Sequence, residues 1–177
     1  YKRQTKGIPS EHFTRVLRAD PTKKGLLYAG TETGIYISFD DGRSWNPFQL
    51  NLPIVPVTDL TIKENSLIVA TQGRSLWILD DLTVLHQIDK NTINQPINLF
   101  KPKDSYRTQG SSTKKTSSAD NIVNVVLTQG SNLPNGVIVH FNLKDFNDKK
   151  YTLALYFKEQ NGTLIKKYSS TDKEDKL

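Results

Sequence analysis

The sequence predicts an all-β fold that contains two consecutive four-stranded units, a polar linker and a further β module. Apolar and alternating segments recur throughout the first half and are separated by Gly-, Asp- and Asn-containing turns, which is the pattern of short strands. An Asp-Gly pair at 41–42 lies between two of these segments and indicates a hairpin. Leu27, Thr31 and Asp40 recur as Leu67, Thr71 and Asp80, so the first half repeats with a period of about 40 residues.

The repeat allows each strand to be placed in order. The segment 67–70 is apolar at every position, as expected for a strand that is buried on both faces. The first unit is predicted to have strands at 13–19, 26–31, 34–39 and 45–50, and the second at 57–62, 66–71, 75–79 and 84–88.

The most informative turn is the octet 38–45, Ser-Phe-Asp-Asp-Gly-Arg-Ser-Trp. Gly42 can adopt the positive φ that a tight turn requires. Asp40 or Asp41 can accept backbone N–H groups, as in an Asx-turn, and Trp45 can fold back over the loop. These carboxylates are therefore predicted to stabilise a turn rather than to act in catalysis.

The octet resembles the Asp-box, Ser/Thr-x-Asp-x-Gly-x-Thr/Ser-Trp, of sialidase-like and sortilin-like β-propellers. The flanking segments 26–36 and 67–82 resemble the last blades of large bacterial proteins described as sortilin-like or as glycosyl hydrolases with BNR repeats. The resemblance implies that 8–101 forms two C-terminal blades of an Asp-box propeller, in a secreted or bacterial cell-envelope protein. The motif positions are Ser38, Asp40, Gly42, Ser44 and Trp45.

The second unit departs from this motif, because neither Gly nor Trp follows Asp80-Asp81. The segment 102–120 is rich in Ser, Thr and Lys and is predicted to be a polar linker. Strand signals return at 122–128, 136–143, 151–158 and 163–168, and the resemblance implies that 121–177 is the start of an immunoglobulin-like module.

Composition excludes several classes of function. The 177 residues include no cysteine, which rules out disulfides and Cys-based metal sites. The net charge of +6 comes from scattered Lys and Arg residues without a basic stripe, so nucleic acid is not an expected partner. No apolar run approaches the ~18 residues of a membrane span. Because the sequence begins with Tyr1 and contains no methionine, we expect it to be part of a longer protein.

Catalytic chemistry finds little support in the sequence. A glycosidase needs two carboxyl groups within ~5–10 Å of each other, but the Asp pairs at 40–41 and 80–81 are separated by a whole repeat. The histidines His12, His86 and His140 lack the spacing of a zinc site, and no cofactor motif is present. We therefore assign no catalytic residue, metal ligand or cofactor.

Two turn residues remain candidates for ligand contact. Glu32 lies in the turn between the second and third strands, and Arg74 occupies the equivalent turn of the next repeat. Loops at one end of a propeller line the mouth of its channel, so these side chains are predicted to meet a ligand there.

Two functions remain open at this stage. The first is a non-catalytic interaction or scaffold segment of a larger β-propeller, which binds protein, peptide or glycan through the loop face. The alternative is a fragment of an Asp-box glycoside hydrolase that resembles xyloglucanases or sialidases. Two blades leave sheet faces exposed, so the predicted partners are the remaining blades of the parent chain or another protein chain.

Overall fold

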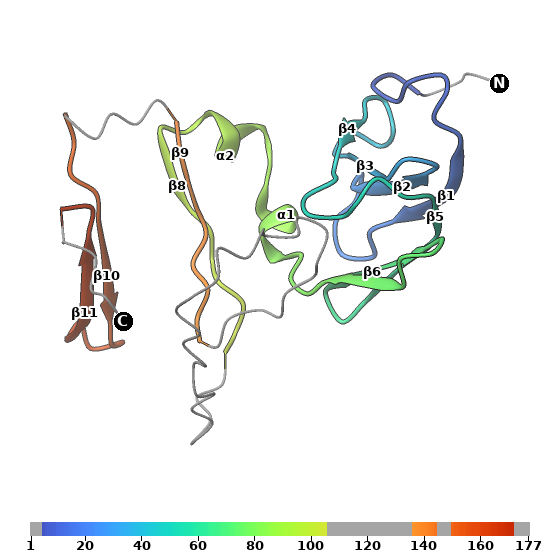
Figure 1. The fold of residues 1–177 in the computed structure, drawn as a ribbon. Helices are drawn as coiled ribbons and strands as arrows, with labels where there is room; N and C mark the ends of the chain where they lie inside the picture. The colour runs from blue at the N-terminus through green and yellow to red at the C-terminus, as the bar shows by residue number, and fades with distance from the viewer. Residues whose placement is uncertain (1–4, 106–135, 145–149, 172–177) are drawn as a thin grey trace, which may run out of the picture. The chain divides into compact units, whose positions relative to one another are not determined.

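The structure is a computed structural model that describes residues 5–105, 136–144 and 150–171. Within these residues the chain forms small antiparallel sheets and two short helices, which confirms the predicted all-β class (Figure 1). The chain divides into two compact units. The first takes in the described residues of 1–88 and 100–140, and the second those of 89–99 and 141–177.

The first sheet has the order β1-β2-β3-β4 and is antiparallel throughout. Its strands are β1 (Thr14–Ala19), β2 (Leu27–Thr31), β3 (Ile35–Ser38) and β4 (Asn46–Pro47). The fourth strand is shorter than the predicted 45–50. Pro47 has no N–H to donate to a ladder, and Leu50 has a φ of 45°, which strands do not use.

The second sheet contains β5 (Val57–Lys63), β6 (Ser66–Thr71) and β7 (Leu76–Leu79) in that order. The prediction of a fourth strand at 84–88 was wrong, because the chain forms helix α1 (Thr83–Gln87) there. Asp81 Oδ1 accepts the Thr83 N–H at 2.9 Å and the Asn65 side-chain amide at 3.1 Å, which turns the chain away from β7.

The two sheets pack against each other through one buried cluster. β1 and β2 contact β5, and Leu82, which is fully buried, joins the cluster from the segment before α1. The opposite face of the first sheet holds a smaller cluster of Ala29, Tyr36 and Trp45, against which Ile8 packs. The main cluster includes Val16, Tyr28, Ile35 and Ile37 of the first sheet and Val57, Leu60, Leu67 and Val69 of the second.

The second unit begins with α2 (Lys90–Asn94), which Asp89 caps by accepting the backbone N–H groups of Asn91 and Thr92. Two ladders follow, one between β8 (Ile97–Leu99) and β9 (Phe141–Leu143), the other between β10 (Ala154–Lys158) and β11 (Leu164–Ser169). Residues 97–99 thus belong to this unit, although the sequence analysis predicted that the two blades extend to residue 101. The expected strand at 122–128 and most of the linker lie outside the described residues.

Candidate functional site

The turns of the first unit lie at two opposite ends of its sheets, because neighbouring strands are antiparallel. We call one end the Asp-box end, which comprises the turns at 20–26 and 39–45 together with α1. We call the other the loop end, which comprises the turns at 32–34 and 72–75 and residues 12–13. The Glu32 N–H donates to Phe13 O at 3.2 Å, which places residues 12–13 at the loop end.

At the Asp-box end, the Asp40 carboxylate is the centre of the turn. Its Oδ1 accepts the Ser38 hydroxyl at 2.8 Å and the Ser44 N–H at 2.9 Å, and its Oδ2 accepts the Ser44 hydroxyl at 2.6 Å. Asp41 and Gly42 both have positive φ, 63° and 81°, and the Gly42 N–H donates to Ser38 Oγ at 2.9 Å. Both carboxylate oxygens of Asp40 are therefore engaged within the turn.

Electrostatics agree with this structural role for Asp40. Hydrogen bonds from Ser44, first its hydroxyl and then its N–H, lower the pKa of Asp40 from 3.8 to about 2. A general acid needs the opposite shift. Trp45, at the end of the turn, is buried. Its backbone N–H donates to Lys6 O at 2.8 Å, so the turn also holds the N-terminal segment.

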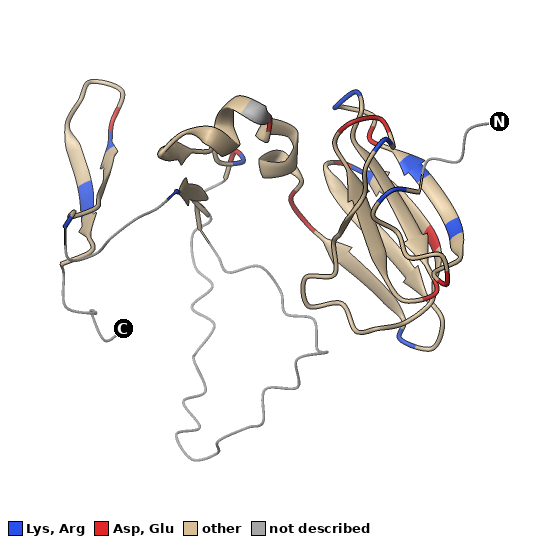
Figure 2. Ribbon diagram, turned by 90° about the horizontal axis from the view of Figure 1, so that it is seen from above, with Lys and Arg blue, Asp and Glu red and all other residues tan. Residues whose placement is uncertain are grey.

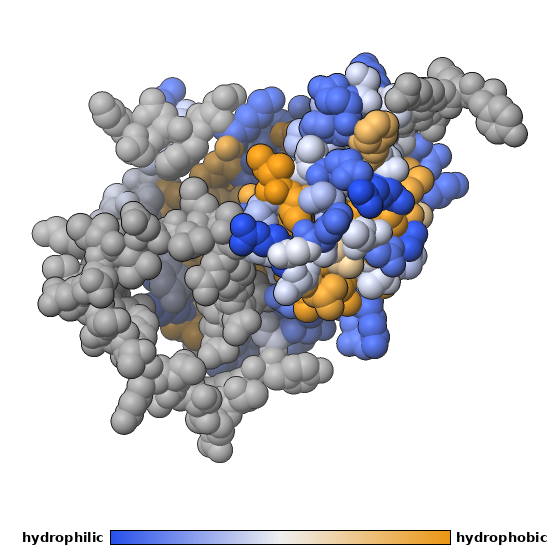
Figure 3. Space-filling model, turned by 45° about the vertical axis from the view of Figure 1, so that its right-hand side comes forward, coloured by the Kyte–Doolittle hydropathy of each residue, from blue (hydrophilic) through white to orange (hydrophobic). Residues whose placement is uncertain are grey.

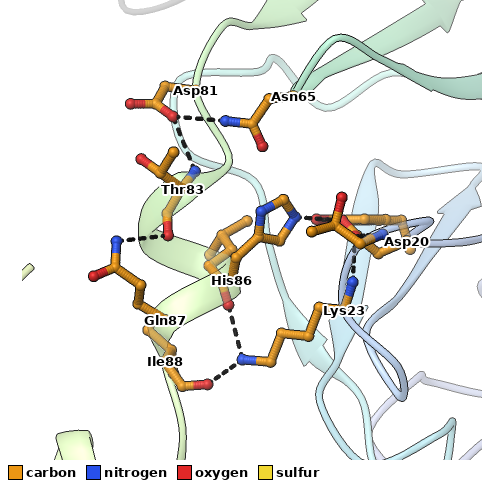
Figure 4. Close-up of polar contacts among 11 residues, drawn as sticks. Asp20, Lys23, Asn65, Asp81, Thr83, His86, Gln87 and Ile88 are labelled. Atoms are coloured by element: carbon orange, nitrogen blue, oxygen red, sulfur yellow. Dashed lines mark hydrogen bonds and ion pairs between the residues drawn. The ribbon is translucent and has the colours of Figure 1, made fainter. Parts of the chain in front are cut away.

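A second polar network at the same end joins α1 to the first sheet (Figure 4). Asp20 has a fully buried side chain, whose Oδ1 accepts the N–H groups of Thr22 and Lys23 at 2.8 and 2.9 Å. Its Oδ2 accepts the Tyr28 hydroxyl at 3.2 Å and lies 2.9 Å from His86 Nε2 of α1. Burial alone raises the pKa of Asp20, but the bonds from His86, Lys23 and Thr22 outweigh it and leave the pKa below its ordinary value.

Lys23 adds a second connection between the same two elements. Its Nζ donates to the carbonyl oxygen of Leu85 within α1 at 3.0 Å and also to that of Ile88, the residue after the helix (Figure 4). Cations stabilise the carbonyl end of a helix, where backbone acceptors lack helical partners. The Asp20–His86–Lys23 network therefore fixes α1 on the β1–β2 turn, and its buried groups are occupied by structural contacts.

At the loop end, the two residues predicted to contact a ligand, Glu32 and Arg74, lie in different surroundings. Glu32 forms an exposed ion pair with Arg15 of β1, with Oε1 2.7 Å from Nη2. Arg74 lies exposed in the β6–β7 turn, where its carbonyl accepts the Trp77 indole N–H at 2.9 Å. No described contact joins Glu32 to Arg74, and their role in ligand binding stays a prediction. The positions of Lys and Arg residues and those of Asp and Glu residues are interspersed along the backbone of the first unit (Figure 2).

The structure also shows a polar cluster at the loop end that the sequence analysis missed. His12 Nδ1 lies 2.8 Å from the Tyr36 hydroxyl and 2.9 Å from the Thr33 hydroxyl. Burial, followed by the nearby charge of Glu11, raises the pKa of Tyr36. The cluster borders an open cleft of about 330 Å³, whose other walls include Ile35, Pro47, Gln49 and Ile54.

Three carboxyl groups among the described residues, Glu11, Asp20 and Asp40, have displaced pKa values, and all three are displaced downwards. Among the described residues no group of His, Asp and Glu side chains is arranged to hold a metal ion. The helices in the described part of the chain are too short to cross a membrane.

Comparisons with protein-family models, with curated proteins and with solved structures found no match to this chain.

Proposed function

We propose that this chain is a non-catalytic interaction segment of a larger, secreted or envelope-located β-propeller, in which the two sheets are consecutive blades. The observation that carries this proposal is the way the two repeats stack face to face. A repeat of about 40 residues that buries one sheet face on the next repeat is the construction principle of propellers and related repeat proteins.

The stacking leaves one face without a partner among the described residues. The face of the first sheet that bears Ile35 and Ile37 is buried by the second sheet. The corresponding face of the second sheet bears Leu76 and Ile78, which are 68% and 56% exposed. Apolar side chains of this kind reach the surface among polar ones (Figure 3). We infer that a further sheet covers this face in the assembled protein.

The loop end is the binding surface in this proposal. It combines hydroxyl and imidazole groups from Thr33, Tyr36 and His12 with the apolar walls of the 330 Å³ cleft. Such a mixture of apolar contact and a few placed polar groups is typical of sites for peptides or glycans. The glycoside hydrolase alternative gains no support from Glu11, Asp20 and Asp40, because their pKa values are displaced downwards and a general acid needs a raised pKa.

The proposal is tested by presenting the chain to a glycan array and to a displayed peptide library. Hits are then measured by calorimetry against Thr33→Ala and Glu32→Gln, with Lys24→Ala at the Asp-box end as the matched control. We expect the two loop-end variants to weaken binding at least fivefold and the control to leave it unchanged. Equal binding by all three variants, or no hit in either library, would contradict a ligand site at the loop end.

A further inference from the structure

We propose that the cleft beside His12 binds an uncharged hexose, whose hydroxyl groups donate hydrogen bonds to the Thr33 and Tyr36 side chains. The inference rests on the proposed function, since it names the class of ligand that the loop end binds. It follows from where the hydrogen atoms lie among the side chains of His12, Thr33 and Tyr36, which we call the His12 cluster.

One ring nitrogen serves both hydroxyl groups of the cluster. His12 Nδ1 lies 2.8 Å from the Tyr36 hydroxyl and 2.9 Å from the Thr33 hydroxyl. A neutral imidazole carries a proton on one nitrogen and accepts at the other. With the proton on Nδ1, the Tyr36 O–H would have no acceptor among the described residues, although the Tyr36 side chain is only 6% exposed. Buried donors are nearly always hydrogen-bonded, which argues against that tautomer.

The tautomer with the proton on Nε2 satisfies the whole cluster, because both hydroxyl groups can then donate to Nδ1. Burial raises the pKa of Tyr36, so its phenol keeps the proton that it donates. The other neighbour of the Thr33 hydroxyl is Thr31 Oγ1, at 3.3 Å, whose own proton is donated to Gly34 O at 3.0 Å. The nearer acceptor for Thr33 is therefore Nδ1.

This assignment sets the hydrogen-bonding polarity of the cleft. The protons of Thr33 and Tyr36 point at His12, so their oxygen atoms offer lone pairs to a ligand. Every buried side-chain nitrogen or oxygen in the described part of the chain has a partner, and none is found for His12 Nε2, which therefore reaches the surface. The cluster thus presents two acceptors and one donor.

The other walls of the cleft add no charge. They include Ile35, Pro47, Gln49 and Ile54. The Gln49 side-chain amide is already engaged, since its Nε2 donates to the carbonyl oxygens of Leu52 and Pro53 at 2.8 Å each.

An anionic ligand is disfavoured by this polarity. A carboxylate only accepts hydrogen bonds, so it would face the two acceptors of the cluster. Arginine is the usual partner of a bound carboxylate, but Arg15 at this end is paired with Glu32. The ligand is therefore uncharged and carries hydrogen-bond donors.

The spacing of the two acceptors favours a sugar over an extended peptide. Both oxygen atoms contact the same nitrogen, so they are no further apart than the two contact distances combined. That limit is below the ~6.6 Å between successive N–H groups on one side of an extended chain. Neighbouring hydroxyl groups of a hexose lie closer together and can reach both oxygens. Pro47 and Ile54, which is 84% exposed, offer apolar surface to the C–H face of the ring.

The first test reads the tautomer of His12 directly. Long-range proton–nitrogen NMR of the full chain at pH 8 distinguishes a protonated ring nitrogen from an unprotonated one. We expect the proton on Nε2. A proton on Nδ1 would overturn the proposal, because the hydroxyl groups would then donate into the cleft.

The second test uses three matched pairs of ligands. These are the methyl glycosides of glucose, galactose and mannose, and the corresponding methyl uronosides, in which a carboxylate replaces the hydroxymethyl group. At least one neutral glycoside is expected to shift the amide signals of Thr33 and Tyr36, and its uronoside to bind at least fivefold more weakly. Equal or tighter binding of the uronoside, or no shift with any neutral glycoside, would refute the proposal.

Variants of the chain localise the contacts. Tyr36→Phe and Thr33→Val each remove one hydroxyl and preserve most of the shape, and each is expected to weaken glycoside binding at least fivefold. The matched control is Thr22→Val at the Asp-box end, since Thr22 is exposed and its hydroxyl has no partner among the described residues. If Tyr36→Phe fails to fold, the comparison of Thr33→Val with Thr22→Val decides, and equal affinities would overturn the proposal.

The failure of this inference is distinct from that of the proposed function. If a peptide or an acidic glycan binds at the loop end and is weakened by Thr33→Ala, while no neutral glycoside binds, the hexose is refuted and the proposed function stands. If no ligand of any of these classes binds at the loop end, both are refuted.

Discussion

Gly30→Ala tests the close approach of the two sheets. Gly30 is in β2 with no positive φ, and an added Cβ would lie 2.6 Å from Cγ1 of both Val16 and Val57. Carbon atoms in contact normally lie ~3.5–4.0 Å apart, so each methyl group has to move by about 1 Å. Valine has few alternative rotamers in a strand, and overpacking of this kind costs about 1–3 kcal/mol. Removing glycine from a strand recovers about 0.5–1 kcal/mol, so the midpoints of the two ranges give a net destabilisation of about 1 kcal/mol.

The assay is urea unfolding, with tryptophan fluorescence as the probe. Both tryptophans, Trp45 and Trp77, lie in the first unit and report on it alone. Each 1 kcal/mol corresponds to a fall of about 4–8 °C in the Tm of a unit of this size. The double variant Gly30→Ala/Val57→Ala makes space for the new Cβ, and we expect its loss to be about 1 kcal/mol smaller than the sum of the single losses.

The repeat itself provides the control for this experiment. Ala70 occupies in β6 the position that Gly30 has in β2, and it is only partly buried. Ala70→Val should therefore change the free energy of unfolding by no more than about 0.5 kcal/mol. A neutral Gly30→Ala, or an additive double variant, would refute the sheet-on-sheet packing described above.

Three further predictions concern the Asp-box end. Asp40→Asn is expected to lower the free energy of unfolding by about 1 kcal/mol at pH 7. This loss is small because the Asp40 side chain is partly exposed and solvent screens its interactions. Because the folded pKa of Asp40 is about 2, against 3.8 for the ordinary side chain, the contribution of its carboxylate is complete above about pH 4 and is lost as the pH falls towards 2. Urea titrations between pH 2 and 4 should show that the free energy of unfolding of Asp40→Asn falls less steeply with acid than that of the unaltered chain. Equal slopes for the two proteins would contradict this role of Asp40. Asp20→Ala should cost about 3 kcal/mol in the same assay, since His86 and Tyr28 lose a buried acceptor; a loss below about 1 kcal/mol would mean that the network is not formed in solution. Lys23→Met should speed amide exchange within α1 while leaving β2 unchanged, and unchanged exchange in α1 would argue against the cap.

The first sheet could be predicted closely because its determinants are local. Alternating segments separated by turn residues placed β1, β2 and β3 within one or two residues of their observed bounds. The octet 38–45 contains all the side chains that close its own turn, so its hydrogen bonds follow from the sequence spacing. These features need no information from distant parts of the chain.

The features that were missed depend on contacts between distant residues. Residues 84–88 have the composition of a strand, but Lys23 and Asp20, more than 60 residues away, hold them beside the β1–β2 turn. The cluster around His12 forms only when the strands bring residue 12 beside residues 33 and 36. β8 is a strand of three residues whose partner, β9, lies more than 40 residues further along the chain. A single sequence carries no local signal for such pairs.

The central claim is that the two sheets are consecutive blades whose assembly continues on the second sheet. The most direct measurement is an experimental structure of the natural protein that carries these residues. The account predicts that a further β-sheet packs on the face of Leu76 and Ile78 and that both side chains become buried. A structure in which this face meets only solvent, or in which the two described sheets are not packed together, would contradict it.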